Sequence, residues 1–390
     1  MLNCQKDKFN LSDEVSYINC AYMSPNLKTV EEAGIQAILK KSKPWKVTRA
    51  DFFEPVEQVK NTFAKLINCS DTQRIALIPA ASYGIANVVK NINATSKSNI
   101  VLTDEGFPSN FYSWKKLSEE TGAEIRHISA PKSEASKGEI WNENILNAID
   151  ENTVAVALGN VHWADGTVFD LKKLRAKTTQ NDALLIVDGT QSVGAYPFDI
   201  QDIKLDALIC AGYKWLLGPY VSGVSYFGEK FDQGSPIEEN WINRLDSHQF
   251  ENLVNYQPEY KPKANRYSMG EQSNFVGIPM LQKSLEQILD WGIENIQDYC
   301  KNLSKNPIQD LLEMGCQLEN EAYRAPHLFG VRLSPKMDME KLKSNLEKDN
   351  VKVSQRGNAI RIAPHVYNTS EDFEKLVHCF KQSISQKTIF

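Results

Sequence analysis

Two short apolar runs, each followed at once by polar residues, decide the fold: residues 184–192 read LLIVDGTQS and residues 206–219 read DALICAGYKWLLGP. Both runs are rich in Leu, Ile and Val, which is typical of strands buried on both faces of a parallel sheet. Ligands of such sheets bind at the carboxyl ends of the strands. Asp188 and Lys214 therefore stand where we expect the chemistry of this chain.

The same pattern extends outward from these runs. Apolar runs alternate with amphipathic stretches from about residue 54 to residue 227, which predicts an α/β fold with a mainly parallel sheet covered by helices. Residues 54–67 are one such helix, because Val56, Val59 and Phe63 fall on one face. The predicted strands are 74–78, 99–103, 124–128, 153–158, 184–187, 207–210 and 223–227.

Residues 232–263 interrupt the alternation, since they are rich in Gln, Asn, Pro and charge and are expected to form loops. A second unit should follow them. It is predicted to hold a long helix through 280–290, strands near 328–333, 351–354 and 359–363, and a helix at 370–380 with Ser370 as its N-cap. We predict a large domain over residues 21–275, and a smaller α+β domain made of residues 1–20 and 276–390.

Composition excludes several classes of function. The 390 residues carry a net charge of -5, which gives no basic field to attract nucleic acid. The first residues are too polar for a signal peptide and no apolar run is long enough to span a bilayer, so we expect a cytoplasmic protein without a membrane segment. The seven cysteines and six histidines show no metal-ligand spacing, and no metal site is predicted.

Asp188 and Lys214 each admit two interpretations when taken alone. Asp188 is either a functional carboxylate or a cap for the turn that follows it. Lys214 is either a nucleophile whose pKa is lowered by desolvation, or a surface lysine whose stem packs on Tyr213 and Trp215. Their order and spacing, considered together, decide between these interpretations.

Asp188-x-x-Gln191, followed by Lys214 within residues 212–219 (GYKWLLGP), resembles the cofactor signature of the class V aminotransferases. That family also contains cysteine desulfurases, selenocysteine lyases, kynureninases and isopenicillin-epimerase-like proteins. The similarity extends from residues 17–25 (YINCAYMSP) to residues 360–369 (IRIAPHVYNT). The resemblance implies the fold of the fold-type I transferases that depend on pyridoxal 5'-phosphate (PLP), with PLP held as a Schiff base on Lys214.

The resemblance also implies roles around the ring of the cofactor. Asp188 would keep the pyridine nitrogen protonated, so that the ring withdraws electrons from the substrate. Gln191 would hydrogen-bond the phenolic oxygen, and Phe107 would stack on the ring, although core packing is the alternative for Phe107. His162 and Trp163 occupy a segment in which relatives usually offer Asn or Gln near the cofactor hydroxyl.

The phosphate of the cofactor needs backbone N–H groups and hydroxyls. Ser82 and Tyr83 stand at the start of a predicted helix, where the helix dipole favours an anion, and Tyr213 precedes the cofactor lysine. We predict that these three residues bind the phosphate. A serine common in this phosphate cup is replaced by Ala211.

The substrate would be held through its carboxylate. Arg361 matches the arginine that clamps the α-carboxylate in this family, a task that suits its planar pair of donors, with a surface ion pair as the alternative. Arg356 is close in sequence and is predicted to face the same site, and Tyr22 lies in the family's N-terminal active-site segment. An amino acid is therefore the predicted substrate.

The family's sites usually lie at a dimer interface, so the resemblance implies a homodimer with its active site between subunits. Many relatives place a threonine, which reaches the phosphate of the neighbouring subunit, where this chain has Glu271. A carboxylate there would repel the phosphate. Asn274, Ser273 or backbone groups are candidates to replace it.

The cofactor motifs do not choose among the reactions of the family. The leading prediction is an aminotransferase that acts on a small amino acid; the alternatives are β-elimination of the cysteine or selenocysteine lyase type, epimerisation, and a silent PLP-binding scaffold. Residues 355–360 contain no thiol, although desulfurases need a cysteine just before the carboxylate arginine, so persulfide formation is disfavoured. Retention of Lys214, Asp188, Gln191 and Arg361 argues against a silent scaffold.

Overall fold

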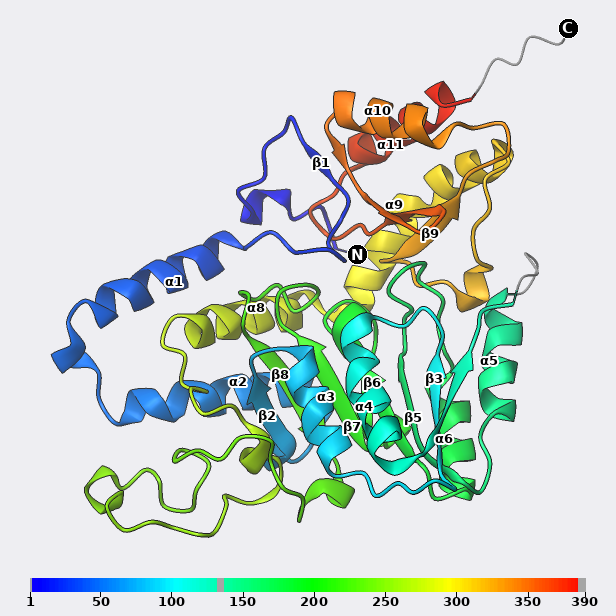
Figure 1. The fold of residues 1–390 in the computed structure, drawn as a ribbon. Helices are drawn as coiled ribbons and strands as arrows, with labels where there is room; N and C mark the ends of the chain where they lie inside the picture. The colour runs from blue at the N-terminus through cyan, green and yellow to red at the C-terminus, as the bar shows by residue number, and fades with distance from the viewer. Residues whose placement is uncertain (1, 132–136, 385–390) are drawn as a thin grey trace, which may run out of the picture.

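A seven-stranded sheet forms the centre of the protein, whose computed structural model describes residues 2–131 and 137–384. The strand order is β2-β8-β7-β6-β5-β3-β4, and only β8 runs antiparallel to its neighbours. The predicted α/β fold with a mainly parallel sheet is confirmed (Figure 1). The strands are β2 (Ile75–Ile78), β3 (Asn99–Thr103), β4 (Glu124–Ile128), β5 (Thr153–Gly159), β6 (Leu184–Asp188), β7 (Ala207–Ala211) and β8 (Gly223–Phe227).

Helices cover both faces of this sheet. Successive side chains of a strand point to opposite faces, so alternate residues contribute to two separate cores. The first core lies under α2 (Glu54–Leu66), α5 (Lys137–Asn147), α6 (Leu171–Gln180) and α8 (Gly277–Trp291). The second core lies under α3 (Ala81–Lys90) and α4 (Tyr112–Thr121).

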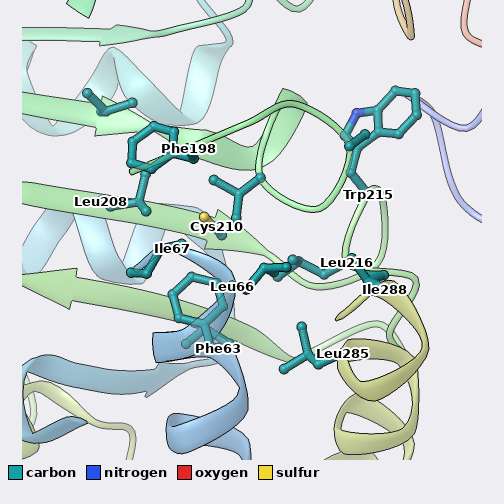
Figure 2. Close-up of a cluster of buried hydrophobic side chains, with 14 of the residues drawn as sticks. Phe63, Leu66, Ile67, Phe198, Leu208, Cys210, Trp215, Leu216, Leu285 and Ile288 are labelled. Atoms are coloured by element: carbon teal, nitrogen blue, oxygen red, sulfur yellow. The ribbon is translucent and has the colours of Figure 1, made fainter. Parts of the chain in front are cut away.

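The α2 helix shows how the sequence produces this arrangement. Pro55 occupies the first turn, where its missing N–H costs no helical hydrogen bond. Val56, Val59 and Phe63 then recur at helical spacing and are buried against the sheet. Figure 2 shows this core where α2 and α8 meet the end of β7, with labelled side chains from Phe63, Leu66, Ile67, Phe198, Leu208, Cys210, Trp215, Leu216, Leu285 and Ile288.

A second, smaller unit packs beside the carboxyl ends of the large sheet (Figure 1). Its antiparallel sheet has the order β11-β12-β9, formed by β9 (Phe329–Arg332), β11 (Ser354–Arg356) and β12 (Ala359–Ile362). Helices α9 (Ile293–Glu313), α10 (Met339–Lys348) and α11 (Ser370–Gln382) belong to the same unit. β1 (Ser16–Tyr17) pairs in parallel with β10 (Val351–Lys352), so segments from near both ends of the chain meet there.

One detail differs from what the sequence suggested, and one prediction stays open. The N-cap of α11 is Thr369, and Ser370 is the first helical residue, because Thr369 has an extended backbone and forms a capping box with Asp372. The α8 helix packs against α1 (Lys28–Lys41) and α2, and its apolar side chains join the core of the large sheet. The division at residue 275, which would give α8 to the small domain, stays a prediction.

The segment 232–263 forms loops and short 3-10 turns, such as Phe250–Asn252, and extends from the large unit at the lower left of Figure 1. Within the described ranges 2–131 and 137–384, no helix combines the length and the apolarity needed to cross a membrane. In the same ranges, no cluster of three or more His, Cys, Asp and Glu side chains could hold a metal ion.

We expect Phe63→Ala to destabilise the protein by roughly 3–5 kcal/mol, because it opens a cavity between α2 and the sheet. The matched control is Leu312→Ala on α9, where the leucine is 43% exposed, and there we expect a loss below about 1 kcal/mol. Urea unfolding of both variants measures the difference. Equal losses would contradict the packing described for α2.

Candidate active site

A cavity of about 280 Å³ opens at the carboxyl ends of β5, β6 and β7, beside the first turn of α3. This is the location expected for ligands of a parallel α/β sheet. Most of the side chains predicted to form the site meet there. The lining includes Ser82, Phe107, His162, Trp163, Asp188, Gln191, Tyr213 and Lys214.

Lys214 lies just beyond the end of β7 and is 6% exposed. Its Nζ is 5.2 Å from the ring centroid of Phe107 and 5.5 Å from that of Tyr213. Burial lowers the pKa of Lys214 to about 8, against the opposing effect of Asp188. An amine with this pKa is partly neutral near neutral pH, so it can act as a nucleophile or accept a proton.

A glycine sets the path of the chain before this lysine. A Cβ on Gly212 would lie 1.9 Å from the backbone oxygen of Ser222, which is closer than any side chain permits. The backbones of residues 212 and 222 can therefore approach only because position 212 has no side chain. This close approach holds Tyr213 and Lys214 at the wall of the cavity.

Asp188 is the last residue of β6, and its Oδ1 accepts the N–H of Thr190 at 3.0 Å. Burial raises the pKa of Asp188 above its ordinary value, and the nearby amine of Lys214 acts in the opposite direction. A buried carboxylate gains from a cationic partner. The protonated pyridine nitrogen of PLP is a group that fits this requirement.

Gln191 lines the cavity but already has two partners. Its Nε2 donates to the backbone oxygen of Ala21 at 3.2 Å, and its Oε1 accepts from Nε1 of Trp215 at 2.8 Å. A side-chain amide has a second N–H, which is the group that could reach a phenolic oxygen. The side chain is thus held in one orientation from both sides.

The first turn of α3 offers N–H groups to the cavity. Ala80 precedes the helix in an extended conformation and supplies no side-chain cap, so the first amides have no partner inside the helix. Ser82 also lines the cavity, as a phosphate ligand would. The structure directs Tyr83 elsewhere, because its hydroxyl donates to Oε2 of Glu238 at 2.7 Å and its side chain does not line the cavity.

Aromatic rings close the outer side of the cavity. Phe107 and Trp163 meet edge to face, with ring centroids 5.4 Å apart. Nε1 of Trp163 donates to the backbone oxygen of Glu105 at 2.7 Å. His162 is buried, with Nδ1 3.0 Å from Oδ1 of Asp165, so its ring has a fixed orientation.

The three predicted substrate residues are not part of this lining. Arg361 is 1% exposed, and its Nη1 donates to the backbone oxygen of Trp163 at 2.8 Å. The guanidinium of Arg356 lies 5.4 Å from the ring centroid of Trp163. Both arginines are near enough to Lys214 to lower its pKa. Tyr22 is 56% exposed and is the least enclosed of the three.

The residues considered for contact with a second subunit have mixed environments. Glu271 is exposed. Asn274 accepts the N–H of Gly277 at 2.8 Å at the start of α8, and the hydroxyl of Ser273 donates to the backbone oxygen of Phe52 at 2.6 Å. Their reach toward a neighbouring cofactor stays a prediction.

His327 and Thr190 support the site, and the sequence analysis missed both. Nε2 of His327 donates to the backbone oxygen of Gln191 at 2.8 Å, and Nδ1 accepts from Gln297 at 3.1 Å. The His327 ring meets the Trp215 ring edge to face, with the ring centroids 4.5 Å apart.

Oγ1 of Thr190 accepts the N–H of Ala211 at 3.1 Å, which connects the end of β6 to the end of β7. Thr190 could have been predicted, because it follows a strand directly. No sequence motif distinguishes His327 from the other histidines.

A family model described as "Aminotransferase class-V" matches residues 45–377, which is most of the chain. The chain belongs to this family. The members of the class V family are PLP-dependent enzymes, so the predicted family, cofactor and enzyme class are confirmed.

Several class V relatives cover much of this chain. The uncharacterized aminotransferase YcbU of Bacillus subtilis (strain 168) is 28% identical over 357 residues, covering 90% of this chain and 88% of that protein. A cysteine desulfurase of Escherichia coli O8 (strain IAI1) is 27% identical over 262 residues, covering 66% of this chain and 62% of that protein. The solved structure of the cystine C-S lyase C-DES, in complex with cysteine persulfide, has a TM-score of 0.83 at 16% identity, covering 96% and 99% of the chains, and shows the shared fold alone.

We expect acid to destabilise the protein partly through His327. Burial lowers the pKa of His327 to about 4. As the pH falls below about 6.5, the unfolded chain therefore binds a proton on this histidine, whereas the folded chain does not bind it until the pH is near 4. Stability from this group is present above pH 6.5 and is lost as the pH falls toward 4. Between pH 7.5 and pH 5 the wild type should lose about 2 kcal/mol more than His327→Gln, which cannot titrate.

Urea unfolding at the two pH values measures this difference, since the other titrating groups are the same in both proteins. The matched control is His378→Gln on the exposed face of α11, which should lose as much stability as the wild type. An equal loss in wild type and His327→Gln would show that His327 is not held neutral by its burial.

Proposed function

We propose that the protein is an aminotransferase that removes the amino group of a small α-amino acid and passes it to a 2-oxo acid. The observation that carries the PLP chemistry of this proposal is the pairing of a nucleophilic amine, Lys214, with the carboxylate of Asp188 in one small cavity near a buried arginine. Amino-group transfer is preferred because the chain is similar to the uncharacterized aminotransferase YcbU over most of its length and no cysteine lines the described cavity. A cavity of about 280 Å³ is at the low end for ligand sites, which favours small substrates once the cofactor is bound.

Each residue has a proposed task. Asp188 would hold the pyridine nitrogen of PLP, the amides of α3 with Ser82 would hold its phosphate, and Phe107 would cover its ring. When bound, PLP supplies an electron-withdrawing ring that accepts the electron pair left at the α-carbon. Lys214, with a pKa near 8, would take the proton from the α-carbon of the substrate and deliver it to C4′ of the cofactor.

Arg361 would bind and orient the substrate. Its Nη1 is held by the backbone oxygen of Trp163, while Nε and Nη2 are buried without a hydrogen-bond partner. These two atoms form one edge of the guanidinium, which matches the two oxygens of a carboxylate. A substrate carboxylate on this edge would be near Lys214, because Arg361 is close enough to that amine to lower its pKa.

Thiol-dependent desulfuration has no support in this site. The turn between β11 and β12 contains Gly357 and Asn358, and no cysteine lines the described cavity. Cys20 is the thiol whose charge would act on Lys214, but burial raises its pKa to about 12, so it stays protonated. β-Elimination needs no thiol on the protein. It is the second candidate reaction, and the experiment below must distinguish it from transamination.

The proposal includes a homodimer in the cytoplasm. One segment exposes several large apolar residues, as a subunit contact would require: Ile35, Ile38 and Leu39 on α1, and Trp45 beyond it.

The proposed location in the cytoplasm agrees with the cysteines, because all seven are free, which is usual in a reducing compartment. A free amino acid, and no nucleic acid, would be the partner of the site.

We expect Lys214 to be the sole covalent anchor of PLP. Borohydride reduction of the holoenzyme, followed by peptide mapping, should place the label on Lys214 alone. Lys261 is a built-in control, because burial also lowers its pKa to about 8 but it does not line the cavity. Label on Lys261 or on another lysine would contradict the assignment.

The reaction type is tested by mixing the holoenzyme with a panel of small amino acids in the absence of any acceptor. Transamination should release one equivalent of 2-oxo acid per active site and then stop until a second oxo acid is added. Continuous release of pyruvate and ammonia would instead indicate β-elimination, and appearance of the opposite enantiomer without oxo acid would indicate epimerisation. Absence of all three reactions would refute the proposal for these substrates.

A further inference from the structure

Two arginines share one face of the hairpin formed by β11 and β12, next to Trp163, which lines the cavity. In the antiparallel register, Arg361 of β12 is opposite Ser354 of β11, and residues directly opposite each other point to the same face. Ser354 and Arg356 are two apart on one strand, so they share that face as well. Arg356 and Arg361 therefore project from the same side of the hairpin, toward Trp163.

Neither guanidinium has a carboxylate partner among the described residues. Arg361 is 1% exposed, with Nε and Nη2 buried and without a hydrogen bond. Nε of Arg356 is also buried and unpaired, and its Nη1 donates only to the backbone oxygen of its neighbour Gln355. A buried cation that lacks a counter-ion is costly, which applies fully to Arg361, while Arg356 is only partly buried. A ligand that brings negative charge therefore gains most at Arg361, and it also gains at the buried Nε of Arg356.

One carboxylate cannot neutralise both groups, because it carries one negative charge and the two guanidinium groups carry two positive charges. The free edge of Arg361 takes two oxygens, which is the whole of an α-carboxylate. Arg356 would then still lack an anion. Each charge also disfavours the other, since burial and the nearby Arg356 lower the pKa of Arg361 to about 9, and Lys214 adds a third positive group. Within residues 2–131 and 137–384, Asp188 is the one carboxylate that acts on Lys214, and PLP would engage it.

We propose that the substrate is an α-amino acid whose side chain carries a second anionic group, and that Arg356 binds this group while Arg361 binds the α-carboxylate. The matching 2-oxo acid would use the same pair. Trp163 fixes the relative position of the two arginines, because its backbone oxygen accepts from Arg361 and its ring lies 5.4 Å from the guanidinium of Arg356. This inference rests on the proposed function for the role of Arg361 and for the reaction that follows binding.

The first test compares acids with their amides. We expect wild-type holoenzyme to have a higher kcat/KM for aspartate or glutamate than for asparagine or glutamine. Arg356→Gln should lower kcat/KM for the acid by about 10- to 100-fold, the loss of a charge-assisted hydrogen bond, and should change that for the amide by less than about threefold. Lys352→Gln, which removes one exposed charge from β10, is the matched control and should leave both values unchanged.

A second test does not depend on any reaction. Calorimetric titration should show that succinate and glutarate bind the wild type more tightly than butyrate, and that Arg356→Gln removes this preference while the absorbance of the bound cofactor stays unchanged. If dicarboxylates bind in this way but no oxo acid forms, the proposed reaction fails and the present inference stands. The inference would be overturned if Arg356→Gln lowered kcat/KM equally for acids and amides. It would also be overturned if the wild type bound dicarboxylates no more tightly than butyrate.

Discussion

The burial of an amine beside two guanidinium groups, balanced by one carboxylate, is the constraint on which the rest of this structure depends. Like charges that share a desolvated site repel one another, so they stay together only when rigid elements hold their stems. Lys214 and Asp188 are held at the ends of β7 and β6, whose central residues are buried on both faces of the sheet. The arginines come from a hairpin of the second unit. The three cations are therefore together only while the two units stay packed against each other.

A chain of buried contacts behind the cavity joins those units. His327, from the segment that leads into β9, donates to the backbone oxygen of Gln191 and packs its ring on Trp215. Trp215 in turn donates to the side chain of Gln191. Hydrogen bonds of this kind are strong in a dry interior, and each is costly to leave unmade. Rotation of one unit against the other would break several of these hydrogen bonds at once. The two units therefore hold the site in one arrangement before a substrate binds.

The sequence predicted the elements whose signal is local. Strands such as 99–103 and 223–227 have the predicted bounds, because apolar runs between turn residues leave little freedom. Lys214 and Asp188 could be singled out because both follow such runs. The partners of Tyr83 and the role of His327 could not, since Glu238 and Gln191 are distant in the chain and only tertiary packing brings them together. The packing of α8 against α1 and α2 is a similar case, because those helices are distant from it in the chain.

The parallel pairing of residues 16 and 17 with residues 351 and 352 affects how the chain is made. The loop that this pairing closes is most of the protein, and although the entropy of closure grows slowly with length, the search for such a distant partner is slow. On a ribosome, the large sheet and its helices can assemble once α8 has emerged. The first strand must wait for the last quarter of the chain. A nascent chain therefore carries a finished scaffold whose arginines have not yet been synthesised, and it gains its charged pocket only as translation ends.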